Sequence, residues 1–211
     1  MSDVMERIRS ERVVAVLRAN SPGELMEVAG ALREGGIRCL EFTMTTPGAV
    51  EMIRKAVAEL GEDVLLGAGT VLTAADAEAA LGAGARFLVS PSLKIEVIGA
   101  AKRRGVPVLP GAFTPTEVLA AWEAGVDAVK VFPAGQLGPS YIKDLHGPFP
   151  GLPLLPTGGI GIDDAAAYLE AGAVAVGVGG NLTRRADGEP ASALTERARQ
   201  LVENVRRVPR R

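Results

Sequence analysis

Several features are scarce in this chain of 211 residues, and each scarcity narrows what the protein can be. There is one cysteine, Cys39, so no disulfide can form within the chain, which favours a reducing compartment. No window approaches eighteen apolar residues, and residues 1–10 are charged without an apolar signal core, so we expect no membrane span and a cytoplasmic protein. The net charge is −2 with no basic block in the body of the chain, which speaks against nucleic acid as a partner.

Metal ligands are scarce as well. His146 is the only histidine, and its position before Gly147-Pro148 is typical of a structural residue at a helix end. No group of histidine, cysteine and carboxylate residues has the spacing of a metal site. Leu40 and Phe42 follow Cys39 closely, which predicts a buried thiol rather than a nucleophile. We therefore expect no metal.

What the chain has in abundance is a repeated unit, a short apolar run followed by a helical segment. Glycines often end the helical segments, and Ser21-Pro22 and Thr114-Pro115 are typical helix starts. Eight such units follow one another with short links. The apolar runs lie at residues 12–18, 38–43, 64–69, 87–89, 107–109, 127–133, 153–156 and 174–178.

Strands that alternate with helices predict an α/β fold with a parallel sheet, and eight units close into a (β/α)8 TIM barrel. The open alternative is a doubly wound sheet, but residues 18–22 occupy the turn where dinucleotide binders carry Gly-x-Gly-x-x-Gly. We expect one domain over residues 1–211, with a leading helix at 1–10 and a C-terminal helix at 189–208.

Lys130 stands out among the five lysines because it alone lies inside an apolar run, Asp127 to Pro133. Burial favours the neutral form of an amine, and a neutral amine can form a Schiff base with a carbonyl compound. A lysine at a strand end can also simply extend to water. In a barrel, however, the active site lies at the carboxyl ends of the strands, and there we interpret Lys130 as a catalytic residue.

Asp127 only opens its run, whereas Glu41 lies inside one, between Leu40 and Phe42, and we expect Glu41 to act as a general acid and base beside Lys130. An imine draws electrons from the bond two atoms away, and a carboxylate can remove the hydroxyl proton whose loss breaks that bond. The pair therefore suits carbon–carbon cleavage, and imine chemistry needs no cofactor.

Two glycine pairs follow the seventh and eighth strands, Gly158-Gly159 and Gly179-Gly180. Loops at these positions of a barrel often hold a phosphate through backbone N–H groups. A single glycine pair is commonly a plain turn, but two on adjacent strands predict a phosphorylated substrate.

The sequence resembles the bacterial 2-keto-3-deoxy-6-phosphogluconate aldolases of the class I type, over nearly its whole length. The segments that carry the likeness are residues 13–18, Leu40-Glu41-Phe42-Thr43, Gly67-Ala68-Gly69-Thr70, Ser90-Pro91, residues 110–117, Val129-Lys130-Val131-Phe132-Pro133-Ala134 and Pro156-Thr157-Gly158-Gly159-Ile160.

The resemblance implies a lyase that cleaves this sugar acid phosphate to pyruvate and glyceraldehyde 3-phosphate. It implies Lys130 as the imine former and Glu41 as the general acid–base. Members of the family are typically cytoplasmic homotrimers that feed the Entner–Doudoroff pathway. The remaining positions that match the family are Thr70, Pro91, Phe132 and Thr157 in the substrate pocket, and Gly158, Gly159, Gly180 and Asn181 around the phosphate.

This sequence departs from the family pattern at three places. Thr45 stands where many members have an arginine that holds the substrate carboxylate, and we hypothesise that Arg18, at the end of strand one, takes over. Asn181 replaces a serine, and its amide can still donate to phosphate. Gly135 stands where a glutamate often follows Pro-Ala.

Other functions remain open at the level of sequence. The same chemistry could act on 4-hydroxy-2-oxoglutarate or on the galactonate epimer of the phosphorylated substrate. A phosphosugar isomerase or epimerase would use Glu41 and the phosphate loops but would leave Lys130 unexplained. A non-catalytic phosphosugar-binding protein would need no nucleophile.

Overall fold

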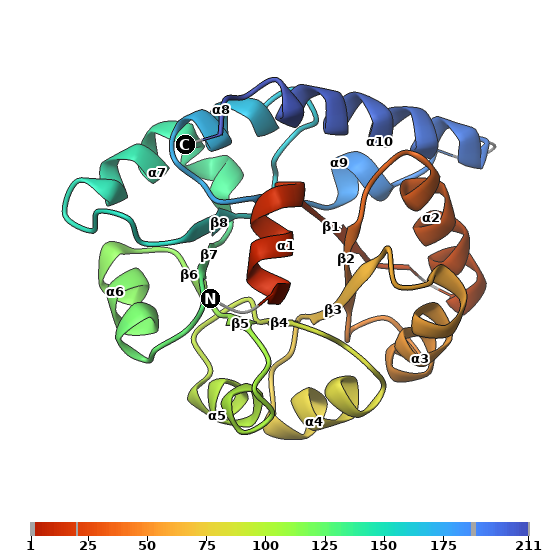
Figure 1. The fold of residues 1–211 in the computed structure, drawn as a ribbon, viewed down its shortest axis with the longest axis horizontal. Helices are drawn as coiled ribbons and strands as arrows, with labels where there is room; N and C mark the ends of the chain where they lie inside the picture. The colour runs from red at the N-terminus through yellow and green to blue at the C-terminus, as the bar shows by residue number, and fades with distance from the viewer. Residues whose placement is uncertain (1–2, 20, 187–188, 211) are drawn as a thin grey trace.

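The strands of the protein form a ring with helices around it (Figure 1). The computed structural model describes residues 3–19, 21–186 and 189–210. The strands are β1 (Val13–Leu17), β2 (Cys39–Thr43), β3 (Leu65–Gly69), β4 (Leu88–Val89), β5 (Val108–Leu109), β6 (Gly111–Ala112), β7 (Val129–Val131), β8 (Leu154–Pro156) and β9 (Val176–Val178).

All strand pairs are parallel, in the orders β5-β4-β3-β2-β1-β9 and β6-β7-β8. Strands β5 and β6 together make one strand position of the barrel. They are separated by Pro110, which has no N–H for an inter-strand hydrogen bond. The carbonyl of Pro110 still accepts from Lys130 N–H at 2.9 Å. A bridge between Thr157 and Gly177 joins β8 to β9 and closes the ring. The predicted (β/α)8 barrel is thus confirmed.

The helices cover the outside of the ring, and the two helix starts predicted at Ser21 and Thr114 are confirmed. Ser21, Thr73 and Thr114 each accept the N–H of the third residue after them, and Thr114 forms a full capping box with Glu117. The helices after β1 are α2 (Pro22–Glu34), α3 (Ala49–Leu60), α4 (Ala74–Gly82), α5 (Ile95–Arg103), α6 (Pro115–Glu123), α7 (Gly138–His146), α8 (Ala165–Glu170), α9 (Gly180–Thr183) and α10 (Ala191–Arg206), with a 3-10 turn, η1, at Ala134–Gln136.

The two terminal helices differ from the predicted bounds. Helix α1 is Asp3–Glu11 rather than 1–10, and residues 1–2 lie outside the described part of the chain. Helix α10 is shorter than 189–208, because Pro190 is extended and acts as its N-cap. At the other end Pro209 disfavours helical backbone at the residue before it, and the helix stops at Arg206.

The core is divided by the ring of strands into an outer and an inner cluster. The outer cluster lies between strands and helices and includes Leu40, Phe42 and Val131. The inner cluster combines alternate strand residues, such as Cys39, Leu65 and Phe87, with side chains of α1. Helix α1, red in Figure 1, lies across the ring and closes its amino end with Val4, Met5 and Ile8. The carboxyl end of the barrel has no such cover from α1.

Candidate active site

Glu41 and Lys130 both face the inside of the barrel. On β2, Glu41 is two residues from Cys39, which packs in the inner cluster, and side chains alternate along a strand. On β7, Lys130 is likewise two residues from Ala128 of the same cluster. Glu41 is 2% exposed and Lys130 is 5% exposed. The fold therefore carries a carboxyl group and an amine into the carboxyl half of an otherwise apolar interior.

Glycines on the inner face make room for Glu41, for Thr157 and for the backbone at Pro91. A Cβ atom on Gly69 would lie 1.8 Å from Glu41 Oε1, and one on Gly177 would lie 2.2 Å from Thr157 Oγ1. Gly111, level with Lys130 on the neighbouring strand, would place a Cβ 2.2 Å from the carbonyl oxygen of Pro91. Real atoms do not approach this closely, so a larger residue at any of these positions would displace the neighbouring atoms. This set was missed in the sequence, although the alternating glycines of β3 were a visible signal.

The Glu41 carboxyl group is in an unusual electrostatic setting. Burial raises the pKa of Glu41 above its ordinary value, while the nearby charges of Lys130 and Arg18 act to lower it. Its Oε1 atom is buried and accepts no hydrogen bond. A carboxyl group with a raised pKa and a free acceptor atom is suited to take up and return a proton.

The Lys130 amine lies 5.0 Å from the centroid of the Phe132 ring. The charge of Lys130 acts on the Glu41 carboxyl group, so the two groups are close enough to interact. They do not form an ion pair, because none of the ion pairs within the described residues involves Lys130. Phe132 also packs against the loop after β8, where a Cβ on Gly158 would lie 2.7 Å from the ring. Phe132 therefore joins the lysine to the glycine loop.

Arg18 follows β1 directly and is exposed, and its charge reaches Glu41. Beside it lies a chain of threonine hydroxyls that sequence reasoning missed. Thr45 Oγ1 donates to Thr43 Oγ1 at 3.3 Å, Thr43 and Thr46 share a bond of 3.3 Å, and Thr46 Oγ1 accepts the N–H of Ala19 at 3.4 Å. The signal was the threonine-rich run that follows strand β2. This network fixes the backbone next to Arg18.

The other predicted pocket residues come from four strands and all lie at the carboxyl end. Thr70, directly after β3, has a φ of +54°, a left-handed conformation that non-glycine residues adopt at a cost and that is frequent at functional sites. Pro91 follows β4 and Phe132 follows β7, and both are partly exposed. Thr157 follows β8 and is buried.

The two predicted phosphate loops lie next to each other. Asn181 Nδ2 donates to the carbonyl of Ile160 at 3.0 Å, which ties the β9 loop to the β8 loop. The sequence led us to expect this amide to donate to phosphate, but in the structure one of its N–H bonds is used between the loops. Gly180 opens the short helix α9.

Gly158 and Gly159 have φ values of +89° and +80°, which glycine adopts readily. The 3-10 turn after β7 rests on them, since Gly135 N–H donates to Gly158 O at 2.8 Å. A Cβ on Gly135 would lie 2.9 Å from Gly159 Cα, so the glutamate that many family members carry there does not fit this backbone. The departure at position 135 therefore has a local packing reason.

Two further predictions concern groups outside this arrangement. Burial raises the pKa of the Cys39 thiol to about 12, so the thiol stays protonated, as expected of a packing residue. His146 ends α7, and its Nε2 lies 3.3 Å from the carbonyl oxygen of Gly172. Over the described ranges, no three or more His, Cys, Asp or Glu side chains are grouped to hold a metal ion. The helices in those ranges include none long and apolar enough to cross a membrane.

Comparison with known proteins places this geometry in context. The chain is 39% identical over 170 residues to the 2-dehydro-3-deoxy-phosphogluconate aldolase of Treponema pallidum, covering 80% of each chain. It is 38% identical over 187 residues to the probable 2-dehydro-3-deoxy-6-phosphogalactonate aldolase of Rhizobium meliloti, covering 88% of this chain and 87% of that one.

Among solved structures, it superimposes on the KDPG aldolase of Legionella pneumophila, captured with pyruvate as a covalent carbinolamine intermediate. The TM-score is 0.86 at 28% identity, over 95% of this chain and 98% of that chain. The family described as KDPG and KHG aldolase matches residues 4–191. By that match, over most of its length, the chain belongs to the KDPG and KHG aldolase family.

Proposed function

We propose that this protein is a class I aldolase, a carbon–carbon lyase that cleaves 2-keto-3-deoxy-6-phosphogluconate to pyruvate and glyceraldehyde 3-phosphate. The observation that carries the proposal is the placement of a buried amine, Lys130, and a buried carboxyl group with an unfilled acceptor atom, Glu41, on the inner face of one barrel end. The family membership agrees with this chemistry, because a related enzyme holds pyruvate as a covalent carbinolamine.

The reaction follows from the two groups. The amine of Lys130 in its neutral form attacks the C2 carbonyl carbon, and the hydroxyl group of the resulting carbinolamine leaves as water with a proton from Glu41, which gives a protonated imine and a Glu41 carboxylate. Glu41 then removes the proton of the C4 hydroxyl group, the C3–C4 bond breaks, and its electron pair moves to C3 as the imine becomes an enamine. The aldehyde product departs. Glu41 returns the proton to C3, and water hydrolyses the resulting imine to pyruvate and free Lys130.

The environment of Glu41 suits both halves of this cycle. Its pKa is raised by burial, so it holds a proton more readily than an exposed carboxyl group does, and it can donate that proton to the enamine. The unpartnered Oε1 atom would accept the hydroxyl hydrogen of the substrate. In the apo enzyme this atom is an unsatisfied acceptor, and substrate binding would satisfy it.

The rest of the substrate would lie between the surrounding loops. We propose that Thr70, Pro91, Phe132 and Thr157 line the pyruvate half. The phosphate would bind to the loops of Gly158, Gly159, Gly180 and Asn181, where left-handed glycines let the backbone approach an anion. Asn181 would contribute its second N–H bond, because the first goes to Ile160.

Arg18 is our proposed anchor for the substrate carboxylate, in place of the arginine that position 45 lacks. Its charge reaches Glu41, and it lacks an ion-pair partner among the described residues. In Arg18→Ala we expect the KM to rise about tenfold to a hundredfold with a much smaller change in kcat, as for an interaction made equally in ground and transition states. An unchanged KM would remove Arg18 from this role.

Reductive trapping tests the proposal as a whole. Purified enzyme is incubated with pyruvate and sodium borohydride, and the labelled peptide is identified by mass spectrometry. An imine former is labelled on Lys130, whereas an isomerase, an epimerase or a binding protein is not. Absence of label, or label on another lysine, would overturn the proposal.

The galactonate epimer is the second candidate substrate, because the Rhizobium meliloti relative is named for it. The two sugar acid phosphates and unphosphorylated 4-hydroxy-2-oxoglutarate should be compared by kcat/KM. We expect kcat/KM to be highest for the gluconate-derived substrate and lowest for the unphosphorylated compound, because only phosphorylated substrates would bind the glycine loops. A preference for the galactonate compound would reassign the substrate and leave the imine mechanism intact.

We further propose that residues 1–211 act as one domain, since the site draws on strands from β1 to β9, and that the enzyme is a cytoplasmic homotrimer of the Entner–Doudoroff pathway. The single, buried thiol agrees with a reducing compartment. Exposed apolar side chains support self-association. Among the described residues they are Val57 at 45%, Leu72 at 39%, Ile95 at 66%, Phe113 at 40%, Leu119 at 37% and Trp122 at 39%. Sedimentation equilibrium would test this, and a monomer mass at micromolar concentration would contradict it.

A further inference from the structure

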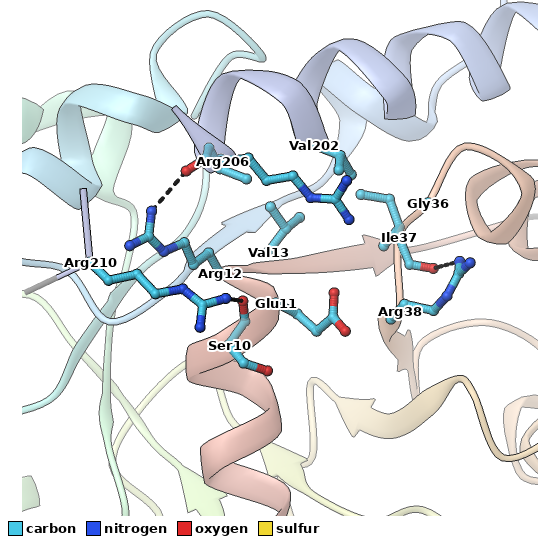
Figure 2. Close-up of a pocket in the computed structure, with 11 residues that line it drawn as sticks. Ser10, Glu11, Arg12, Val13, Gly36, Ile37, Arg38, Val202, Arg206 and Arg210 are labelled. Carbon is cyan, nitrogen blue, oxygen red and sulfur yellow. Dashed lines mark hydrogen bonds between the residues drawn. The ribbon is translucent and has the colours of Figure 1, made fainter. Parts of the chain in front are cut away.

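Two cavities adjoin each other at the amino end of the barrel, on the opposite side from Lys130. They have volumes of about 230 Å³ and about 380 Å³, and they share Ser10, Arg12 and Arg210 as lining residues. Figure 2 shows the first cavity, which lies between the end of α1, the start of β2 and the last turn of α10. Nothing in the proposed aldolase reaction uses this end of the molecule.

The lining of the two cavities is strongly basic. Five arginines contribute to it: Arg9, Arg12, Arg38, Arg206 and Arg210. Two acidic residues, Glu6 and Glu11, also line it. Within the described residues, Arg38 is the member of this group that has an ion pair, at 3.7 Å from Asp63. The cavities therefore hold a surplus of positive charge in a chain whose net charge is −2.

Arg12 sits at the centre and is held in place by the protein itself. Its guanidinium donates to the carbonyls of Val205 at 2.9 Å, in the last turn of α10, and of Val208 at 2.5 Å and Pro209 at 3.2 Å, just beyond that helix. Its backbone is left-handed, with φ at +64°. Burial lowers the pKa of Arg12, and the charge of Arg210 lowers it further. The two guanidinium groups repel each other, and an anion between them would relieve that repulsion.

Arg9 provides an independent observation. Its Nε atom is buried and has no hydrogen-bond acceptor, and the residue lines the second cavity. A buried donor without a partner is costly, and such groups commonly mark a position that a ligand or ion fills. Arg206 and Arg210 are exposed at the mouth, where Arg206 lacks any ion pair among the described residues.

From this arrangement we propose that the amino end of the barrel is a binding site for a small molecule that carries two or more linked phosphate groups. Guanidinium groups match phosphate oxygens in charge and in geometry, and several of them around one cavity favour a polyvalent anion over a single phosphate. The cavity volumes suit a small ligand. Nucleic acid would need an extended basic surface, whereas here the arginines converge on two adjoining cavities.

Calorimetric titration of the full-length protein with inorganic tripolyphosphate at low ionic strength tests the proposal. We expect one site per chain, and an affinity at least about tenfold lower in Arg206→Ala/Arg210→Ala. The matched control is Arg103→Ala/Arg104→Ala, which removes the same charge from the end of α5 and should bind as the wild type does. Both double variants should retain full aldolase activity, because neither touches the carboxyl end.

A gain of affinity provides a second test that a misfolded variant cannot imitate. Glu11 lines the first cavity, so Glu11→Gln should bind tripolyphosphate more tightly by removing a repulsive charge. Equal binding by the wild type and the Arg206→Ala/Arg210→Ala variant would overturn the proposal. So would a short single-stranded oligonucleotide that binds at these arginines and is not displaced by tripolyphosphate.

Discussion

The two halves of the barrel interior are built from opposite kinds of residue. At the amino end, Cys39, Leu65 and Phe87 pack with Met5 and Ile8 of α1, all of them buried and apolar. At the carboxyl end the ring of strands carries Glu41 on β2, Lys130 on β7 and Thr157 after β8, with Gly69 packed against Glu41 and Gly177 against Thr157. The ring of strands therefore encloses packed apolar side chains at one end and the proposed active site at the other.

The difference teaches where stability and chemistry reside in this protein. Burial of apolar side chains stabilises the amino half, whereas burial of Glu41 and Lys130 is unfavourable by itself and is offset by the apolar packing of the rest of the barrel. Substitutions in the two halves should then have opposite signatures. Those at the carboxyl end should change turnover, and those at the amino end should change the free energy of unfolding.

The largest effect is expected from Lys130→Met. Turnover should fall by about 10⁴-fold or more, because the imine cannot form. The free energy of unfolding should stay equal or rise by about 1 kcal/mol, because a desolvated amine is removed. Steady-state kinetics and urea denaturation measure the two quantities. Lys143→Met, at an exposed position of α7, is the matched control and should alter neither. An insoluble Lys130→Met protein would contradict a purely catalytic role.

Glu41→Gln should lower kcat by about 10²–10⁴-fold through loss of the proton carrier. Stability should show a pH signature. The folded pKa of Glu41 lies above its unfolded value of about 4.5, so the stabilisation that its protonated form provides is complete below that value and is lost as pH rises through the folded pKa.

The variant should consequently match the wild type in stability at pH 4 and exceed it, by about 1 kcal/mol, above the folded pKa of Glu41. Urea denaturation across this range checks the trend. A stability difference that does not change with pH would show that the Glu41 carboxyl group titrates in the folded protein as it does in the unfolded chain.

At the amino end, Ile8→Ala should lower the free energy of unfolding by about 2–5 kcal/mol, because the side chain is fully buried between α1 and the strands. The kcat of the protein that remains folded should stay within about twofold of wild type, since no reacting group moves. Denaturant titration with parallel kinetics checks both. A large loss of kcat would show that the two ends are coupled.

The smallest effect is expected from filling a glycine of the site. Gly69→Ala would bring a methyl group onto Glu41 Oε1 and should cost about 1–3 kcal/mol of stability together with part of the activity. Gly30→Ala is the matched control. It lies in helix α2 with nothing within 4 Å, and alanine there should stabilise by up to about 1 kcal/mol. If both variants behaved alike, the packing of Gly69 against Glu41 would be of no consequence.

Much of this architecture can be predicted from local sequence patterns. The alternation of apolar runs and capped helical segments predicts parallel strands, and eight units predict the closed barrel. The helix starts at Ser21 and Thr114 were visible because capping depends on neighbouring residues alone. Lys130 and Glu41 could be chosen because a charged residue within an apolar run is conspicuous before anything is folded.

Only the tertiary structure decided which residues meet. The hydrogen bond from Asn181 to Ile160, the close fit of Gly69 to Glu41 and the approach of Arg210 to Arg12 join positions that no local pattern connects. The separation of β5 from β6 at Pro110 was likewise not predicted from the sequence. A sequence motif reports the preferences of a segment, whereas cavities, unsatisfied atoms and charge surpluses arise from how separate segments pack together. That is why the sequence could indicate the chemistry at the carboxyl end, and why the basic cavities at the amino end became visible only in the folded barrel.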